Sequence, residues 1–280
     1  MKKKEKVAIV ACSNGLAQIQ KQKIDELQEA LMGIGKIPIL SKFLYAKENV
    51  FSGSGEERAL AMMDFYQDEE ITDIYDVSGG DLANEVLTFL DFDVIAKGDK
   101  KFWGYSDLTT ILNAIYTKTG KSSVLYQIRN LVGPEGENQR ARFETEELFH
   151  FSYEFLRGKE MHGILVGGNI RCLLKLAGTE YWPDMDGKIL LLEAMGGGSA
   201  QMATYLNQLS QIGVYKKVKG ILLGTFSQME KNEESPSIID LVMKYAPDDL
   251  PVAKTQEIGH GADSRAIMIG EEIHLCGEKR

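Results

Sequence analysis

Ser106 is the residue best placed to do chemistry, because it lies between an expected strand over 101–106 and an expected helix over 107–116. At such a turn the hydroxyl is held out at the sheet edge, and the next backbone N–H lies beside it at a helix N-terminus. The arrangement predicts a nucleophile with half of an oxyanion hole. The alternative is an ordinary helix N-cap, which a serine followed by Asp107 also fits. Leu108 stands where a nucleophile elbow usually carries a second glycine.

A base and a residue that orients it are also available. His260 lies between two glycines, which predicts a loop histidine able to reach into a cleft, although most loop histidines are simply exposed. Glu193 closes the apolar strand 189–193, where an orienting acid or an edge-blunting charge would stand. Ser106, Glu193 and His260 together make a complete nucleophile, orienter and base set.

Two glycine pairs end expected strands. Gly79-Gly80 predicts either a tight turn or a close backbone approach to a substrate, with N–H groups directed at developing charge. Gly167-Gly168-Asn169 resembles a phosphate loop, but it lacks the dinucleotide fingerprint and a Gly-Lys-Ser/Thr sequence. We therefore discount nucleotide binding through this loop.

The composition and net charge of the chain limit the partners and the location that we expect for the protein. The chain has 280 residues and a formal net charge of −9, with 41 acidic against 32 basic residues, so nucleic acid is not an expected partner. The sequence contains neither an apolar run of membrane-spanning length nor a signal peptide, so we expect no membrane association and a cytoplasmic location. Cys12, Cys172 and Cys276 are far apart in apolar runs, which predicts three buried thiols and no disulfide framework.

Strands alternate with helices in the first half, which predicts a parallel sheet covered on both faces. The expected fold is α/β, with an N-terminal flavodoxin-like parallel sheet domain over 1–157 that carries the nucleophile. A smaller C-terminal mixed, strand-rich α/β domain over 158–280 follows and carries the Glu and the His. A long polar helix near 139–156 is expected at the exit from the first domain, and a hairpin over 265–275 is expected at the end.

The order and spacing of several motifs are similar to those of the LD-carboxypeptidase family of serine peptidases, which includes muramoyl-tetrapeptide carboxypeptidases and microcin C immunity peptidases. The similarity spans nearly the whole chain. The motifs that carry it are Ser78-Gly79-Gly80, Gly104-Tyr105-Ser106-Asp107-Leu108-Thr109, Gly167-Gly168-Asn169, Ala177-Gly178-Thr179, Leu190–Glu193 and Gly259-His260-Gly261.

The resemblance implies roles for individual residues. Ser106 is the implied nucleophile, His260 the general base and acid, and Glu193 the carboxylate that orients His260. The backbone N–H groups of Gly80 and Asp107 form the implied oxyanion hole. A homodimer is implied, and no metal or cofactor is needed.

The chain departs from its tetrapeptide-cleaving relatives near the implied site. Ser78 and Asp81 stand where those relatives often carry Arg and Tyr, and Ala194 stands where an Asp often follows the Glu. Gly79, Asp81 and Arg171 are candidate substrate-binding residues. Arg129, Arg171 or Arg265 could hold a substrate carboxylate.

The implied function is a serine carboxypeptidase that hydrolyses an L,D-peptide bond and releases terminal D-Ala from muropeptide tetrapeptides in cell-wall recycling. An immunity-type peptidase or amidase that cleaves peptidyl- or aminoacyl-nucleotide antibiotics is the second candidate. A non-catalytic small-molecule binding protein on the same scaffold is the third. The expected ligand is thus a small peptide or muropeptide in the first case.

Overall fold

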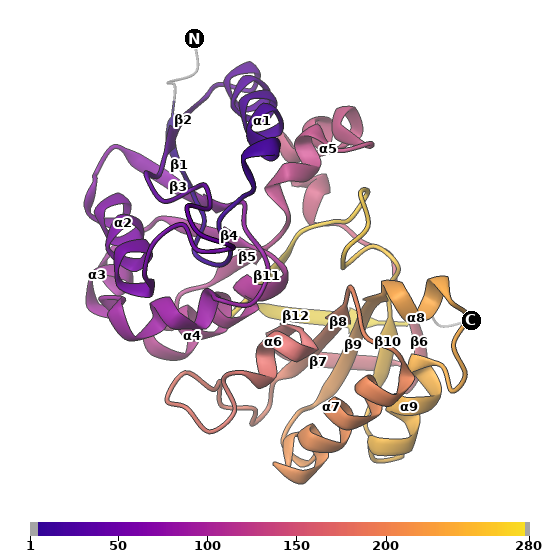
Figure 1. Cartoon of the computed structure of the whole chain (residues 1–280). Coiled ribbons are helices and arrows are strands. Elements are labelled where there is room, and N and C mark those ends of the chain that lie inside the picture. The colour runs from indigo at the N-terminus through magenta and orange to yellow at the C-terminus, as the bar shows by residue number, and fades with distance from the viewer. Residues whose placement is uncertain (1–4, 278–280) are drawn as a thin grey trace.

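The first half of the chain and one strand from its end form a six-stranded sheet that is parallel except at one edge (Figure 1). The computed structural model describes residues 5–277. In spatial order, the strands are β11 (Ile267–Ile269), β5 (Ser123–Leu125), β4 (Lys101–Gly104), β3 (Ile71–Asp76), β1 (Glu5–Val10) and β2 (Lys36–Leu40). Only β11, from the end of the chain, runs antiparallel to its neighbour.

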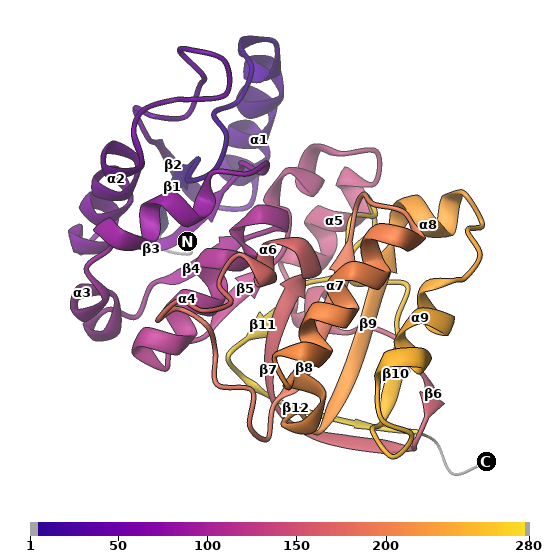
Figure 2. The same ribbon diagram turned by 60° about the horizontal axis from the view of Figure 1, so that its bottom comes forward.

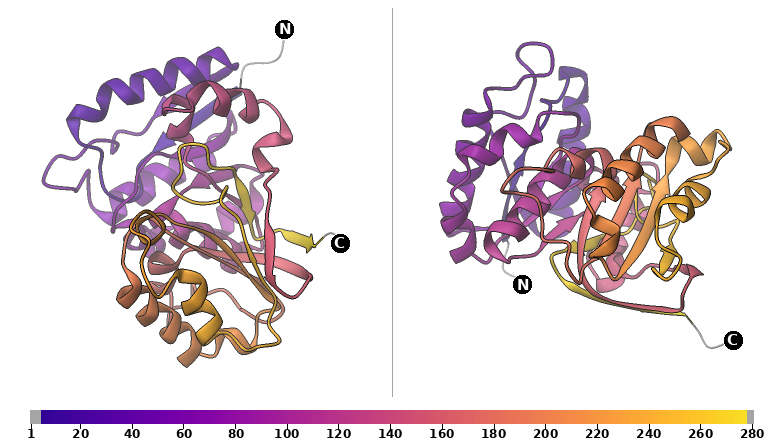
Figure 3. Two further views of the ribbon diagram at one scale, coloured as in Figure 1. Left: turned by 90° about the vertical axis from the view of Figure 1, so that its right-hand side faces the viewer. Right: turned by 90° about the horizontal axis from the view of Figure 1, so that it is seen from below.

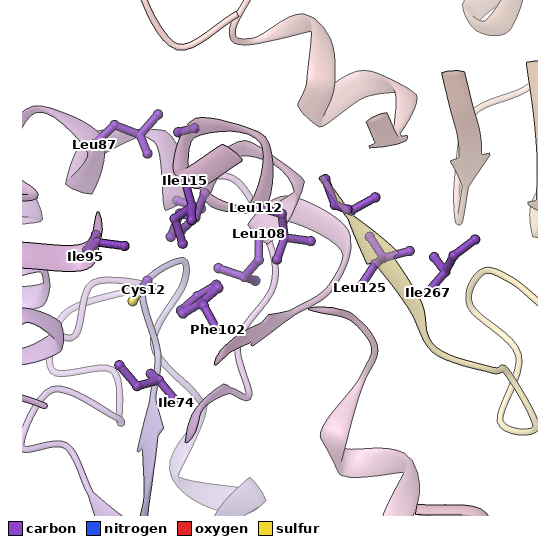
Figure 4. Close-up of a cluster of buried hydrophobic side chains, with 14 of the residues drawn as sticks. Cys12, Ile74, Leu87, Ile95, Phe102, Leu108, Leu112, Ile115, Leu125 and Ile267 are labelled. Atoms are coloured by element: carbon purple, nitrogen blue, oxygen red, sulfur yellow. The ribbon is translucent and has the colours of Figure 1, made fainter. Parts of the chain in front are cut away.

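Both faces of this sheet are buried, as the near-continuous apolar strands predict. In β1, Ala8 and Val10 face one core cluster, whereas Val7 and Ile9 face another. The covering helices are α1 (Lys21–Gly33), α2 (Gly55–Gln67), α3 (Phe92–Lys97) and α4 (Thr109–Thr119). Figure 4 shows the first cluster, in which Leu108 and Leu112 of the segment after Ser106 lie close to Phe102 of β4.

The second half forms a mixed six-stranded sheet. In spatial order, the strands are β12 (Glu272–Cys276), β7 (Glu160–Asn169), β8 (Ile189–Ala194), β9 (Gly220–Phe226), β10 (Val252–Lys254) and β6 (Glu154–Arg157). The helices of this half are α6 (Ile170–Leu174), α7 (Ser199–Gln211), α8 (Ser227–Lys231) and α9 (Ile238–Tyr245). The two halves lie side by side as two lobes (Figure 3), and the expected α/β fold class is confirmed.

The alternation of side chains along β8 decides where Glu193 points. Ile189 and Leu191 belong to the cluster that the second lobe shares with the first, whereas Leu190 and Leu192 pack against the helices on the other face. Because strand side chains alternate with a period of two, Glu193 falls on the same face as Leu191, toward the first lobe.

Three local expectations are wrong. The terminal hairpin does not form, because Ile267 of β11 pairs with Leu125 of β5 (Figure 4) while β12 pairs with β7 in the other sheet. The long polar helix is broken into α5 (Gly136–Phe143), a 3-10 turn and strand β6, which pairs with β10. Cys276 is exposed, because it lies on the outer face of β12, whereas Cys12 and Cys172 are buried as expected.

Within residues 5–277, no helix is long and apolar enough to cross a bilayer.

Helix α4 packs between the two lobes. The buried Asn113 side chain accepts a hydrogen bond from the Gly167 N–H at 2.8 Å and donates one to the Gly167 carbonyl at 2.9 Å. Thr109 Oγ1 accepts a hydrogen bond from the Asn169 N–H at 3.0 Å. These bonds tie the helix after Ser106 to the end of strand β7.

We expect Asn113→Ala to destabilise the protein, because it leaves the N–H and the carbonyl of Gly167 unpaired in the interior. The free energy of unfolding should fall by about 2–6 kcal/mol, given about 1–3 kcal/mol for each of these two unsatisfied buried groups. Urea denaturation followed by circular dichroism measures the change. Asn138→Ala removes a hydrogen bond to Glu135 at an exposed position and is the matched control. Equal stability of the two variants would contradict the prediction.

Candidate active site

Ser106 lies at a sharp turn from β4 into a 3-10 turn over Ser106–Leu108, which continues as α4. Its φ of 54° is in the left-handed region, which is uncommon for a residue with a side chain. Tyr105 and Leu108 occupy the N-cap positions of the turn and of α4, and neither makes a side-chain cap hydrogen bond. The capping alternative for Ser106 is therefore not what the backbone adopts. The strained turn matches the geometry of a nucleophile elbow.

Glu193 and His260 form a buried pair. The Glu193 side chain is 1% exposed and that of His260 is 6% exposed, and Glu193 Oε2 lies 2.6 Å from His260 Nδ1. Within the described part of the chain, His260 Nε2 and Glu193 Oε1 have no hydrogen-bond partner. The carboxylate thus fixes the ring through Nδ1 and leaves Nε2 able to exchange a proton with another group.

The loop that carries His260 is pressed against the end of β9. Gly259 has a φ of +143°, and a Cβ there would lie 2.0 Å from Thr225 Oγ1, so only glycine fits. The Thr225 N–H donates to the Ile258 carbonyl at 2.8 Å, which fixes the start of the loop.

The ring of Tyr105 lies 4.3 Å from the ring of His260, measured between centroids. Burial, reinforced by the nearby Glu193 carboxylate, raises the pKa of the Tyr105 hydroxyl, so the phenol stays neutral. Because Tyr105 directly precedes Ser106, this contact brings His260 beside the end of β4. This contact therefore places the Glu193–His260 pair beside the residue that precedes Ser106.

The loop after β3 is held by Asn14, which follows β1. The Asn14 N–H donates to the Gly79 carbonyl at 3.2 Å, and Asn14 Oδ1 accepts from the Asp81 N–H at 3.0 Å. Gly80 has a φ of +122°, and a Cβ there would lie 2.2 Å from Asn14 Cγ. The close approach requires glycine.

The buried carboxylate of Asp76 supports the same loop after β3. Asp76 accepts hydrogen bonds from the Cys12 N–H at 2.8 Å and from the N–H and hydroxyl of Ser78. Burial raises the pKa of the Asp76 carboxyl, and these hydrogen bonds oppose the rise. Ser78 is fully buried, so of the two departures beside the glycine pair only Asp81 reaches the surface of the site.

A cavity of about 690 Å³ opens over these elements. Ser106, Gly80, Asp81, Asn169 and Arg171 line it on one side. The segment after Glu193 and helices α7 and α8 line the other side through Met195, Gly196, Gly197, Gln201, Ser227, Gln228, Lys231 and Asn232. The cavity is large enough for a short peptide, and its lining exposes more apolar than polar surface.

The candidate carboxylate-binding arginines are placed differently from one another. Arg171 pairs with Asp81 and donates to the Gly80 carbonyl at 2.9 Å on the cavity wall. Arg265 donates to the Glu147 carbonyl and pairs with Glu257. Arg129 donates to Gln127 beside the loop after β5. Of these arginines, only Arg171 lines the cavity.

Ser13, Asn14 and Lys175 were not singled out from the sequence. Ser13 and Asn14 follow an apolar strand directly, and the rule that sites lie beyond the carboxyl ends of parallel strands could have found them. Lys175 has no such signal, because only the packing of the lobes brings it to the loops. Across residues 5–277, no group of three or more His, Cys, Asp or Glu side chains is arranged to hold a metal ion.

The chain is similar to known proteins both in sequence and in structure. A probable murein peptide carboxypeptidase of Bacillus subtilis is 28% identical over 269 residues, which cover 91% of this chain and 84% of that protein. The structure of the microcin C7 self-immunity protein MccF in complex with aspartyl sulfamoyl adenosine matches with a TM-score of 0.85 at 21% identity, over 99% of this chain and 94% of that one.

A muramoyltetrapeptide carboxypeptidase from Oxalobacter formigenes has a TM-score of 0.81 at 22% identity, over 98% of this chain and 95% of that one. At such identities these two structures bear on the fold alone. Two family models match the sequence itself, the LD-carboxypeptidase N-terminal domain over residues 7–126 and the LD-carboxypeptidase C-terminal domain over residues 162–275. Since the two matches cover most of the chain, the protein belongs to the LD-carboxypeptidase family of peptidases and is a hydrolase.

Proposed function

We propose that the protein is a serine-type carboxypeptidase that hydrolyses an L,D-peptide bond and releases a terminal D-amino acid, D-Ala, from muropeptide tetrapeptides. The observation that carries the proposal is the buried Glu193–His260 pair beside the strained Ser106 turn. Ser106 is the nucleophile, His260 is the base and acid, and Glu193 orients the imidazole.

The reaction proceeds in two steps. His260 Nε2 takes the Ser106 proton as Oγ attacks the carbonyl carbon, and the amide π electrons move onto the oxygen. When the tetrahedral intermediate collapses, the C–N bond breaks, the imidazolium protonates the leaving amine, and D-Ala departs. Water, deprotonated by His260, then attacks the acyl carbon; the bond from that carbon to Ser106 Oγ breaks, the imidazolium returns the proton to Oγ, and the shortened peptide leaves with a new carboxylate.

The developing oxyanion is stabilised by the backbone N–H groups of Gly80 and Asp107. Each belongs to a loop held from outside the site, Gly80 by Asn14 and Asp107 through its buried carboxylate. Preorganised donors of this kind contribute about 3 kcal/mol each to transition-state stabilisation. Glu193 adds stabilisation of the imidazolium that forms beside it.

We assign substrate binding to Gly79, Asp81 and Arg171, of which Asp81 and Arg171 line the cavity. The murein peptide carboxypeptidase of B. subtilis, similar over 91% of this chain, supports a muropeptide substrate in a cell-wall recycling role. The cavity of about 690 Å³ suits a tetrapeptide end. The homodimeric state and the cytoplasmic location stay predictions from the sequence.

An immunity-type peptidase or amidase is the second candidate. The match to MccF bound to aspartyl sulfamoyl adenosine supports it, because the same nucleophile and base would cleave an acyl group from a nucleotide analogue. Gln201, Gln228 and Lys231 line the cavity, and their polar side chains suit a larger polar leaving group. A non-catalytic binding protein is not favoured by any feature of the site.

Ser106→Ala should abolish D-Ala release from an L-Lys-D-Ala or diaminopimelate-D-Ala tetrapeptide, because the variant has no nucleophile. Chromatographic quantification of free D-Ala measures the loss, which should exceed about a thousandfold. Ser210→Ala, at an exposed position of α7, is the control and should retain full activity. Full activity in Ser106→Ala would overturn the nucleophile assignment.

Glu193→Gln should lower kcat by about 10³–10⁴-fold, because the glutamine amide favours the wrong imidazole tautomer while preserving the shape of the side chain. Steady-state kinetics on the tetrapeptide measure the effect. Glu180→Gln changes an exposed carboxylate and is expected to behave like the unmodified enzyme. Retention of more than a tenth of kcat in Glu193→Gln would exclude the orienting role.

The two substrate classes can be separated with the same enzyme. We expect kcat/KM for the tetrapeptide to exceed that for an aspartyl sulfamoyl adenosine by at least about tenfold, a difference of about 1.4 kcal/mol in transition-state binding. Mass spectrometry of both products under identical conditions gives the ratio. The reverse ratio would favour the immunity-type function and leave the serine mechanism in place.

A further inference from the structure

Helix α6 carries two basic side chains to the loops of the first lobe. Arg171 lies within the helix and Lys175 caps its C-terminus, so the two are four residues apart and share one face. In Figure 2, α6 lies between α4 of the first lobe and α7 of the second, and it contacts both helices. Arg171 is assigned to substrate binding above, whereas Lys175 has no role in the reaction as written there.

Lys175 bridges two loops that come from different strands. Its Nζ lies 2.5 Å from Asp107 Oδ1 and donates to the Asp81 carbonyl at 2.9 Å. The Lys175 side chain is 20% exposed and that of Asp107 is 0% exposed, so the ion pair is largely removed from water. Lys175 is the only basic side chain of residues 5–277 that forms a salt bridge with Asp107.

The other carboxylate oxygen of Asp107 extends the connection. Asp107 Oδ2 accepts a hydrogen bond from the Ser13 hydroxyl at 2.7 Å and another from the Ala83 N–H at 2.8 Å. One buried carboxylate thus gathers the segments that follow β1, β3 and β4. The second lobe supplies its counter-charge through Lys175.

Arg171 completes the contact from the same helix. It donates to the Gly80 carbonyl at 2.9 Å and pairs with the Asp81 side chain. The carbonyls of Gly80 and Asp81 therefore both accept hydrogen bonds from side chains of the second lobe. The Gly79 carbonyl, in the peptide unit that contains the Gly80 N–H, is held by Asn14.

We propose that Lys175 is a positioning residue that, from the second lobe, fixes the spacing between the two oxyanion donors. The inference rests on the proposed function, in which the N–H groups of Gly80 and Asp107 receive the oxyanion. Lys175 Nζ contacts the carboxylate of Asp107, which is one of the donor residues. It also contacts the carbonyl of Asp81, which directly follows Gly80, the other donor residue. Seating the second lobe on the first is thus also the step that sets the oxyanion hole.

The proposal predicts different effects on kcat and on ground-state binding. The oxyanion exists only in the transition state and the tetrahedral intermediate, so a change in donor spacing lowers kcat and leaves ground-state binding nearly intact. A purely structural role would instead lower the fraction of folded enzyme and leave kcat per active site unchanged.

The test is the Lys175→Met variant, assayed with the tetrapeptide and with a fluorophosphonate probe whose phosphoryl oxygen occupies the oxyanion hole. Active sites are counted by titration. We expect kcat per active site and the second-order labelling rate at Ser106 to fall by about tenfold or more, with KM within twofold. Lys175→Arg should recover part of the loss, because it restores the charge and a donor.

Lys118→Met is the matched control. Lys118 of α4 pairs with Glu180 of the second lobe at 2.6 Å, so this variant also removes an ion pair between lobes but touches neither oxyanion loop. It should keep the kcat and the labelling rate of the unmodified enzyme. If Lys175→Met behaves like Lys118→Met while the unmodified enzyme is labelled at Ser106, the positioning role is wrong and the proposed function stands.

If the unmodified enzyme neither reacts with the probe nor cleaves either substrate, the proposed function fails, and this inference fails with it. Should Lys175→Met not fold, because Asp107 is left buried without a counter-charge, Lys175→Met/Asp107→Asn removes both charges together. That double variant should fold and still show the lowered kcat. An unmodified kcat in the folded double variant would overturn the proposal.

Discussion

Asn113 of helix α4 forms two buried hydrogen bonds with Gly167, and these bonds join the frame of the first lobe to that of the second. Thr109, on the same helix, receives the Asn169 N–H, and Asn169 stands opposite Glu193 in the register of β7 and β8. A short series of fixed contacts therefore runs from the helix after Ser106 to the acid on the other lobe. A site built on such elements keeps its geometry better than one carried by free loops.

The strained positions of the site depend on this frame. Ser106 adopts a left-handed backbone that a serine does not favour, and it persists because β4 and α4 fix both sides of the turn. The loop of His260 is held by a contact between Gly259 and Thr225 that leaves no space for a side chain. Strain at one residue and close contact at another thus place the hydroxyl and the imidazole.

Buried carboxylates and their partners stabilise the other parts of the site. Glu193, Asp107 and Asp76 are almost completely buried, and each carboxylate has at least one hydrogen-bond partner that offsets the cost of leaving water. For Glu193 the partner is an imidazole that can carry the complementary charge. For Asp107 the partner is a lysine of the other lobe, which connects domain packing with the loops over the cavity.

By itself the sequence determined the α/β class and the order of strands and helices of the first lobe, because apolar runs and helical periodicity are local signals. It also predicted Ser106, Glu193 and His260 as candidate site residues, since each stands at a strand end or between glycines. Only the tertiary structure decided that Ile267 joins the first sheet, that Arg171 faces Asp81, and that Lys175 reaches Asp107. These pairings join residues that are 68 to 142 positions apart in the sequence, and no local pattern encodes them because they arise only when the two covered sheets pack together.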